Sequence, residues 1–423
     1  MGFIDELKWR GMLQDVIPGT EDLLNKGMVK GYIGFDPTAD SLGVGNLVQI
    51  MTLLHFQQAG HKPIALVGGA TGMVGDPSGK SAERNLLDEA TLQHNLNAQK
   101  KQLEKFLNFD CGENSAEIVN NYDWFKGFGF LDFIRDIGKH ITVNYMLSKD
   151  SVQNRLENGM SFTEFSYQLV QGYDFYYLWK NKGVQLQMGG SDQWGNIVTG
   201  TELIRRKDSG EAFALTTPLI KKADGTKFGK SESGNIWLDP ARTSPFKFYQ
   251  FWLNASDVDA ETYIKIFTLK TESEINSLIE KHKEAPHLRE LQKALANDIT
   301  TRVHGDAALQ SAINTTAILF GNSFEDFKQL SPAEIEGAFD ATDIFYLEKN
   351  KLEEGIDTIQ LLAEFSTIYP SKGEARKALQ QNAVSVNKAK IAVDFKPTVA
   401  DFLFEKFVLI QKGKKNYYLI VLN

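Results

Sequence analysis

Hydrophobic positions in the first third of the chain alternate between strand-like and helix-like spacing. Val29 to Phe35 is a short apolar run, Asn46 to Ala59 has helical spacing, and Pro63 to Val67 is a second apolar run leading into glycines. This pattern predicts a βαβ unit and hence a parallel sheet. A further strand, Val184 to Met188, also ends at glycines. Because ligands bind at the carboxyl ends of such strands, we expect the functional site at these turns.

The pattern changes in the second half of the chain. From about Ser244 to Gly321 apolar residues recur at helical spacing, which predicts a separate helical domain. The stretch from Asn322 to Gly355 is less regular and rich in acids, so we expect a linker region there. The last segment pairs a helix, Gly373 to Gln381, with strand-like runs from Ala383 to Asn387 and from Asn416 to Leu422. The ending is therefore predicted to be a small α+β domain.

Composition places the chain among ordinary globular proteins. Its 423 residues predict roughly two to four domains, and 42% hydrophobic with 24% charged residues is normal usage. The single cysteine, Cys111, excludes an internal disulfide framework and fits a reducing compartment, and we expect its thiol to be buried. No apolar run approaches the roughly 20 residues that span a bilayer, and the acidic start does not resemble a signal peptide. We therefore expect a cytoplasmic protein without membrane contact.

Charge is unevenly distributed. The chain has a net charge of −8, but ten bases and four acids from Ser371 onward give that segment +6 and leave −14 for the rest. A basic module on an acidic body is typical of an attached nucleic-acid-binding domain. A solvated basic tail would have the same charge.

The segment from Ser161 to Tyr177 combines a helix start with a polar stripe. Ser161 and Glu164 have the spacing of a capping box. Tyr167, Gln171 and Asp174 follow at i, i+4 and i+7, so their side chains share one helix face among aromatic neighbours. That face is either exposed to solvent or lines a pocket for a ligand with a phenolic hydroxyl and an ammonium group.

Two further segments are candidates for phosphate binding. Leu66 to Arg84 is a glycine-rich turn after a strand; it lacks one residue of the P-loop spacing but offers Asp76, Lys80 and Arg84. Pro218 to Gly234 is a lysine-rich loop around a tight Asp-Gly turn. On these segments alone, solvated surface loops explain both equally well.

Four ordered motifs carry a family resemblance. Lys227 to Ser231 (KFGKS) resembles the KMSKS signature of class I aminoacyl-tRNA synthetases, and Gly31 to Leu47 resembles the stretch that bears their HIGH motif. Together with QMGGSDQWGN (Gln187 to Asn196) and SFTEFSYQLVQGYDF (Ser161 to Phe175), these motifs are similar to bacterial tyrosyl-tRNA synthetases. The resemblance continues through NNYDW (Asn120 to Trp124), a dimer-forming region near GFLDFIRDIGKHITVNYML, and a C-terminal SKGEARKALQQNAVSVN similar to the α-L RNA-binding fold. It covers nearly the whole chain.

The resemblance implies an architecture and an activity. We expect an α/β chain with a Rossmann-like parallel-sheet catalytic domain, an α-helical domain and a small α+β RNA-binding domain of the α-L type. The expected boundaries are 1–222 for the catalytic domain with its dimer interface, 223–243 for the KMSKS-type loop, 244–321 for the helical anticodon-side domain, 322–355 for the linker region and 356–423 for the RNA-binding domain. The implied enzyme is a homodimeric tyrosine–tRNA ligase that uses ATP with Mg²⁺ as substrate and has tRNA(Tyr) and L-tyrosine as partners. We expect no bound organic cofactor and no protein-held metal.

The resemblance also implies roles for individual residues. The tyrosine site would comprise Tyr32, Asp76, Tyr167, Gln171, Asp174 and Gln193. In it, Asp174 and Tyr32 would hold the phenolic hydroxyl. The ATP site would comprise Asp36, Gly45, Asn46, Asp192, Lys227 and Lys230. The catalytic set would be Thr38, Lys80, Arg84, Lys227 and Lys230, and RNA would contact Lys372, Arg376 and Lys377.

One position departs from the family. Gly43 stands where the HIGH-type motif begins with His, so a side chain that helps to bind phosphate is missing. Losing one such donor typically costs about 3 kcal/mol of barrier stabilisation. Two alternatives to tyrosine activation therefore stay open: a tryptophanyl-type synthetase, and an RNA-binding paralogue with impaired activation. The placement of Asp174 for a phenol disfavours the first, and the retained lysines disfavour the second.

Overall fold

The computed structural model describes residues 2–76, 78, 87–149, 152–153, 159–231, 234–321, 323–339, 343–413 and 416–423. The chain divides into two compact units. The first contains Met1–Gly229, Ile236–Asp239 and Trp252–Val303, and the second contains Lys230–Asn235, Pro240–Phe251 and His304–Asn423. Each unit is described by itself, and the five-part domain division stays a prediction.

A five-stranded parallel sheet forms the centre of the first unit. Its strands are β1 (Lys30–Phe35), β2 (Lys62–Val67), β3 (Glu117–Asn120), β4 (Leu186–Gly190) and β5 (Phe213–Thr217). Their order is β3-β2-β1-β4-β5, and every neighbouring pair is parallel. The strand order reverses between β1 and β4, which is where open sheets of this kind bind ligands. The predicted Rossmann-like sheet is confirmed.

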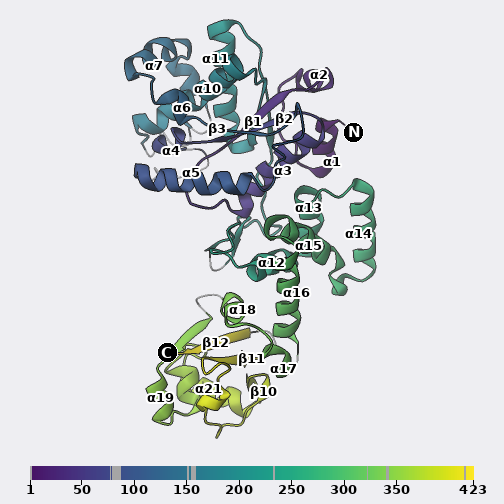
Figure 1. The fold of residues 1–423 in the computed structure, drawn as a ribbon, viewed down its shortest axis with the longest axis vertical. Coiled ribbons are helices and arrows are strands. Elements are labelled where there is room, and N and C mark those ends of the chain that lie inside the picture. Colours follow the sequence, from purple (N-terminus) through teal and green to yellow (C-terminus); the bar gives the residue numbers. More distant parts are fainter. Residues whose placement is uncertain are drawn as a thin grey trace. The chain divides into compact units, whose positions relative to one another are not determined.

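Helices cover both faces of this sheet (Figure 1). Those between residues 1 and 150 are α1 (Phe3–Arg10), α2 (Thr20–Asn25), α3 (Leu47–Gln58), α4 (Thr71–Val74), α5 (Glu89–Leu103), α6 (Tyr122–Phe125), α7 (Phe130–Asp136) and α8 (Val143–Leu147). The later ones are α10 (Phe162–Lys182) and α11 (Trp194–Asp208). α13 (Asp257–Phe267), α14 (Glu272–Glu284) and α15 (Glu290–His304) lie apart from the sheet, with α13 packed on α1 and α3, and α15 ends in the second unit. α3 packs on β1 and β2, and α11 packs on β4 and β5.

Capping residues explain where the central helix α10 begins and ends. The Ser161 hydroxyl accepts a hydrogen bond from the backbone N–H of Glu164 (3.2 Å), which satisfies one of the free amides of the first turn. At the other end Gly183 adopts a left-handed conformation (φ 68°) that non-glycine residues disfavour. The helix start predicted at Ser161 is confirmed, and α10 carries its polar face toward the carboxyl ends of the strands.

The second unit is built on a mixed sheet. Its strands are β8 (Ile344–Leu347), β9 (Val384–Val386), β10 (Ala389–Lys390), β11 (Phe407–Lys412) and β12 (Asn416–Leu422), in the order β10-β9-β11-β12-β8. A separate short pair, β6 (Lys230–Ser231) and β7 (Gly234–Asn235), also belongs to this unit. Its helices are α16 (Asp306–Phe320), α17 (Phe324–Phe327), α18 (Pro332–Gly337), α19 (Lys349–Glu353), α20 (Thr358–Ala363) and α21 (Lys372–Gln380), together with most of α12 (Pro245–Leu253). The segment expected as a linker region thus supplies β8, which pairs with β12.

Both faces of the second sheet are buried. Alternate residues of a strand point to opposite faces, and β11 follows this rule. Val408 and Ile410 join one hydrophobic cluster with residues of α20 and α21, whereas Phe407 and Leu409 join another with residues of α16, α17 and α18. The small α+β fold is confirmed, and within this unit it shares a core with the helices that precede it.

The expectation for Cys111 is wrong. Its side chain is exposed, and the sulfur lies 3.7 Å from the Asn108 carbonyl oxygen and 3.6 Å from Asn114 Oδ1 in the loop between α5 and β3. This loop turns at the surface, with Gly112 at φ 92°, so the thiol does not reach the hydrophobic core. Within the described ranges, no helix is long and apolar enough to cross a membrane.

Candidate active site

A cavity of about 300 Å³ opens at the carboxyl ends of β1 and β4, at the point where the strand order reverses. Eleven residues predicted for tyrosine binding, ATP binding or catalysis line it: Tyr32, Asp36, Thr38, Gly45, Asn46, Asp76, Tyr167, Gln171, Asp174, Asp192 and Gln193. The stripe on α10 therefore faces this cavity and not solvent. The roles given to these residues stay predictions.

The predicted basic residues are distributed differently. Lys227 belongs to the first unit, where it is exposed and does not line the cavity, while Lys230 belongs to the second unit. Lys80 and Arg84 lie outside the described residues. The cavity wall seen in the structure is accordingly acidic and neutral.

Asp174 lies at the buried end of the cavity with both carboxyl oxygens engaged. It is 1% exposed, and it accepts hydrogen bonds from Asn121 Nδ2 (3.0 Å, to Oδ2) and Trp124 Nε1 (2.9 Å, to Oδ1). Burial raises the pKa of Asp174 to about 8, against the lowering effect of these two donors. The carboxyl group is thus fixed in orientation before any ligand arrives.

Tyr32 brings a second polar group to this end. It is 1% exposed, and its hydroxyl has no hydrogen-bond partner among the described residues. Burial, and then the charge of Asp174, raises the pKa of Tyr32, so the phenol is neutral. A buried hydroxyl without a partner is costly. A ligand hydroxyl that bonds to Tyr32 and Asp174 would remove that cost.

Sequence reasoning missed Asn121 and Trp124 as site residues. Both follow the carboxyl end of β3, in the NNYDW segment, and β3 itself was not predicted. Asn121 is further fixed because it accepts from the Ala70 N–H (2.6 Å) and donates to Thr71 Oγ1 (3.1 Å). Trp124 stacks on Tyr177 with ring centroids 4.6 Å apart. The available signal was a polar cluster placed directly after a short apolar run.

Carboxylates and amides surround the middle of the cavity. The Tyr167 hydroxyl donates to Asp36 Oδ2 (3.2 Å), and Gln193 Nε2 donates to Asp76 Oδ2 (2.8 Å). Gln171 Oε1 is buried with no partner in the described part of the chain. Such a set of acceptors suits an ammonium group, which has three N–H donors and no acceptor.

Gln49 is another lining residue that sequence reasoning missed. Its Nε2 donates to Thr217 Oγ1 (2.9 Å), and its Oε1 is buried without a partner among the described side chains and backbone. It lies one turn into α3, three residues after Asn46, so helical spacing from the HIGH-type motif was the available signal.

The HIGH-type turn is paired with the chain segment that follows the lysine-rich loop. The Val44 N–H donates to the Ile236 carbonyl (3.0 Å), and the Leu238 N–H donates to the Leu42 carbonyl (2.8 Å). A Cβ added at Gly43 would lie 3.2 Å from the Ile236 oxygen, so a side chain there requires a shift of a few tenths of an ångström. The space around Gly43 is therefore restricted, but a side chain can be accommodated there after a small backbone shift.

The KFGKS segment is anchored by its phenylalanine. Phe228 is buried among Trp252, Tyr263 and Phe267, with ring centroids 5.9, 5.0 and 5.3 Å away. Gly229 follows at φ 82°, and a Cβ there would lie 3.1 Å from Val44 Cγ2. The two signature segments consequently touch through Gly229 and Val44, with Lys227 on the adjoining exposed side.

The predicted RNA-contact residues share one exposed helix face in the second unit. Lys372, Arg376 and Lys377 are exposed on α21, whose opposite face is buried through Ala375, Ala378 and Leu379. Lys372 forms an ion pair with Glu364. The face is accessible to a phosphate backbone within this unit.

Comparisons with known proteins agree with this geometry. The family described as "tRNA synthetases class I (W and Y)" matches residues 24–321, and the "Tyrosine--tRNA ligase SYY-like C-terminal domain" matches residues 334–420. The chain belongs to the class I aminoacyl-tRNA synthetases of this group.

Full-length relatives narrow the assignment. Tyrosine–tRNA ligases of Porphyromonas gingivalis and Bacteroides fragilis are 60% and 59% identical, and each alignment covers 100% of both chains. A C-terminally truncated mitochondrial tyrosyl-tRNA synthetase from Aspergillus nidulans superposes with a TM-score of 0.67 at 32% identity, covering 75% of this chain and 94% of that one. The chain belongs to the tyrosine–tRNA ligase family and is an enzyme, and the tryptophan-specific alternative is not favoured.

Proposed function

We propose that the cavity activates L-tyrosine with ATP and that the enzyme then transfers the tyrosyl group to the 3′-terminal adenosine of tRNA(Tyr). The observation that carries this proposal is the buried Asp174, held by Asn121 and Trp124 beside the unpartnered Tyr32 hydroxyl. This arrangement favours binding of a ligand with a phenolic hydroxyl, because a ligand without one leaves buried polar groups unpaired.

Tyrosine would span the cavity from the buried end to its middle. Its hydroxyl would bond to Asp174 and Tyr32, and its ammonium group would lie among Asp76, Tyr167 and Gln171, with Gln193 orienting Asp76 (2.8 Å). The carboxylate would then point toward the glycine-rich turns.

ATP would occupy the end lined by Asp36, Thr38, Gly45, Asn46 and Asp192. The carboxylates of Asp36 and Asp192 are hard oxygen ligands and fit a magnesium ion carried by the phosphates as part of the substrate. Lys80, Arg84, Lys227 and Lys230 would neutralise phosphate charge. Catalysis is then positioning and charge stabilisation by these groups.

The two steps conserve atoms without a covalent enzyme intermediate. A tyrosine carboxylate oxygen forms a bond to the α-phosphorus of ATP while the bond to the pyrophosphate oxygen breaks. A ribose hydroxyl of the terminal adenosine next attacks the tyrosyl carbonyl carbon, its proton passes to a phosphate oxygen of the adenylate, and AMP leaves with the bonding pair. Thr38 would assist the first departure by donating to the pyrophosphate.

The assembly and location of the enzyme are also part of the proposal. Exposed apolar side chains on α7 and α8, including Phe130, Leu131 (77% exposed) and Val143, support a homodimer through this region. The exposed face of α21 would bind tRNA, each of the five predicted domains would have its own task, and the reaction would take place in the cytoplasm.

The dimer interface on α7 and α8 can be tested with Leu131→Arg. This substitution should convert the dimeric mass measured by sedimentation to a monomeric one, and an unchanged mass would contradict this interface.

ATP–pyrophosphate exchange tests the activation step. Exchange should depend on tyrosine and be far slower with tryptophan or phenylalanine at equal concentration. Faster exchange with tryptophan would overturn the substrate assignment. Absence of exchange with every amino acid, with tRNA binding retained, would instead favour the activation-impaired paralogue.

A further inference from the structure

We propose that Arg10 is a positioning residue for the KFGKS segment. It is the last residue of α1 and does not line the active-site cavity. It holds the carboxyl end of α13, on which Phe228 of the KFGKS segment packs. This role rests on the proposed function, in which Lys227 neutralises phosphate charge.

Arg10 carries a buried charge with fixed hydrogen-bond partners. It is 2% exposed, and its Nε donates to Glu6 Oε1 one helical turn earlier (2.8 Å). Nη1 donates to the carbonyl oxygens of Lys265 (2.5 Å) and Thr268 (2.9 Å), and Nη2 donates to that of Lys270 (2.8 Å). The guanidinium thus makes four hydrogen bonds, three of them to a single backbone segment.

These three carbonyls lie in the last turn of α13 and directly after it. The last carbonyls of a helix lack donors within the helix, and the helix dipole favours a cation at this end. A planar guanidinium can donate to several carbonyls at once, whereas the ammonium of lysine is a compact point charge on a flexible stem. Arg10 therefore fixes the end of α13 against α1, on which α13 packs.

Phe267 connects the end of α13 to the KFGKS segment. It is 1% exposed and directly precedes Thr268 in the chain. Its ring stacks on the ring of Phe228, with centroids 5.3 Å apart and an interplanar angle of 15°. Because buried side chains are closely packed, a shift of the last turn of α13 displaces Phe228 as well.

Phe228 is adjacent to both features that concern the phosphates. Lys227 precedes it, and Gly229 follows it in contact with Val44 of the HIGH-type turn. A misplacement of about 1 Å caused far from the reacting atoms can lower a rate on the order of 100-fold. In the proposed function tyrosine binds at the other end of the cavity, at Asp174, so a shift of Phe228 should change the rate and not the affinity for tyrosine.

Arg10→Lys tests this role, because it keeps a charge near Glu6 but loses the fork that reaches three carbonyls. Single-turnover adenylate formation at saturating ATP and tyrosine should be about tenfold slower, while the equilibrium affinity for tyrosine changes less than about twofold. An unchanged rate, or a loss of tyrosine affinity as large as the loss of rate, would overturn the proposal.

A double-mutant cycle tests whether Arg10 acts through the ring stack. In a Phe228→Leu background, Arg10→Lys should slow adenylate formation less than about twofold, because the stack is already lost. Full tenfold slowing in that background would overturn the proposal. Phe267→Leu leaves the hydrogen bonds of Arg10 in place and should slow adenylate formation about fivefold, so the link is tested even where Arg10→Lys fails to fold; an unchanged rate in Phe267→Leu would also overturn it.

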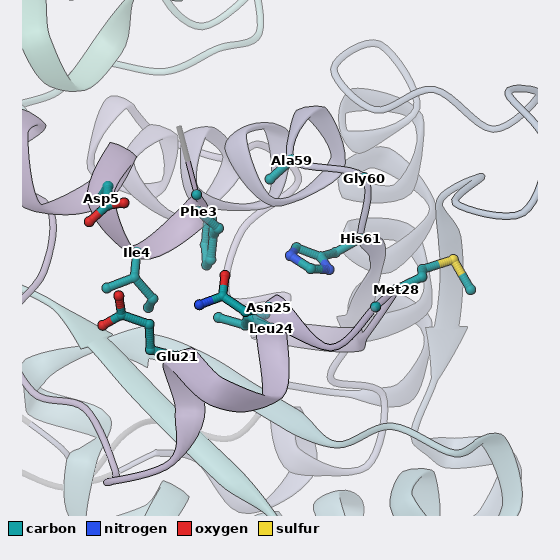
Figure 2. A pocket seen from close by; sticks show the side chains of 12 residues that line it. Phe3, Ile4, Asp5, Glu21, Leu24, Asn25, Met28, Ala59, Gly60 and His61 are labelled. Carbon is teal, nitrogen blue, oxygen red and sulfur yellow. The ribbon is translucent and has the colours of Figure 1, made fainter.

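Leu24→Ala is the control for a general loss of stability. Leu24 is buried on α2 and lines a cavity with Phe3 and Ile4 at the start of α1 (Figure 2), and this cavity shares no lining residue with the active site. The substitution should lower the melting temperature and leave the rate of adenylate formation unchanged. A rate loss equal to that of Arg10→Lys would mean that Arg10 acts only through stability.

Hydrogen exchange tests the role of Arg10 without any reaction. The Ile236 N–H donates to the Gly229 carbonyl (3.0 Å), so its exchange reports whether the KFGKS segment is in place. Arg10→Lys should speed exchange of the peptide that contains Ile236 about tenfold and leave peptides of β2 unchanged. A wild-type protein without tyrosine-dependent pyrophosphate exchange would contradict the proposed function alone, whereas unchanged exchange at Ile236 in Arg10→Lys would overturn the role of Arg10.

Discussion

At the buried end of the active-site cavity, Asp174 accepts two hydrogen bonds and is almost completely buried. The other end is lined by Gly45 and Asn46 of the HIGH-type turn, which has no side chain at Gly43 and adjoins a loop whose Lys227 is exposed. The first region is fixed before substrate binds. The second offers a backbone turn and charges that depend on a loop anchored by Phe228. We therefore expect the first region to control the affinity for tyrosine and the second to control the rate of adenylate formation.

Fixed, buried polar groups act on the bound substrate and its transition state alike, so they set affinity and selectivity. Groups at the phosphates act where charge grows during the reaction, so they set the rate. We therefore expect substitutions near Asp174 to change tyrosine recognition, and substitutions near Gly43 to change adenylate formation at nearly constant tyrosine affinity.

The largest expected effect is that of Asp174→Ala. It would leave the Asn121 and Trp124 donors unpaired in a buried site and remove the carboxyl partner of the substrate hydroxyl, so it should lower kcat/KM for tyrosine in pyrophosphate exchange on the order of 10³-fold. Discrimination against phenylalanine should narrow, because rejection of the analogue depends on these same groups, as is known for this enzyme family. Tyrosine kinetics that stay unchanged would remove Asp174 from the tyrosine site.

The pKa of Asp174 predicts a pH effect on stability. Its folded value of about 8 lies above the ordinary 3.8, so the folded protein retains a proton that the unfolded chain has lost between these values. The stabilising contribution is full below about pH 4 and disappears as pH rises through about 8. Relative to Asp174→Asn, which does not titrate, the wild-type melting temperature should fall progressively from pH 5 to pH 9. Parallel pH curves for the two proteins would contradict the raised pKa.

The α21 face should affect charging of tRNA without affecting activation. Lys372→Gln, Arg376→Gln and Lys377→Gln together should lower aminoacylation kcat/KM at least tenfold, leave pyrophosphate exchange intact and reduce the salt slope of tRNA binding by about 2. The same charge change at the exposed Lys100 and Lys101 of α5 and Lys105, two residues after its end, is the matched control.

Substitution is a better test than truncation here. Removing the chain beyond Ile356 would strip Phe407 and Leu409 from Leu319 and Phe327, which share a hydrophobic cluster with them. Normal charging by the triple variant, with an unchanged salt slope, would count against the RNA-binding assignment of α21.

The smallest expected effect is that of Gly43→His. An imidazole at this turn would donate to phosphate oxygens, but its Cβ must first displace the Ile236 carbonyl slightly (3.2 Å). Gly43→Ala carries the same steric cost without the donor and is the matched control. Single-turnover adenylate formation should be about fivefold faster in Gly43→His than in Gly43→Ala, which is only part of the roughly 3 kcal/mol that a well-aligned donor contributes, because the backbone of this turn is not built to orient an imidazole. A rate that is equal or lower in Gly43→His would mean that glycine is required at this position or that a neighbour such as Gln49 has replaced the donor.

Local signals in the sequence were sufficient for the framework of the site. Three apolar runs, two of them followed by glycines, predicted β1, β2 and β4. The spacing of Tyr167, Gln171 and Asp174 predicted a shared face that does line a cavity. Both are properties of neighbouring residues in the chain. Element ends shifted by a few residues, as at β4, because hydrogen bonds to a neighbouring strand determine where a strand ends.

Features that depend on distant contacts were not predicted. Asn121 and Trp124 reach Asp174 only because β3 lies beside β2, a pairing that no local pattern reveals. β8 is a four-residue edge strand in an acidic stretch, and its pairing with β12 spans about 75 residues of sequence. Cysteine is one of the residue types most often buried, but Cys111 lies in a surface turn.

Whether the two ends of the active-site cavity act independently can be measured directly with Trp124→Phe and Gly43→His, alone and combined. Trp124→Phe removes one donor to Asp174 and should weaken tyrosine binding about tenfold, while Gly43→His should alter only the single-turnover rate. If the ends act independently, the effects on kcat/KM for pyrophosphate exchange will add, with a coupling free energy below about 0.5 kcal/mol. A coupling above about 1 kcal/mol, or a rate change from Trp124→Phe as large as its affinity change, would contradict the assignment of recognition to one end and rate to the other.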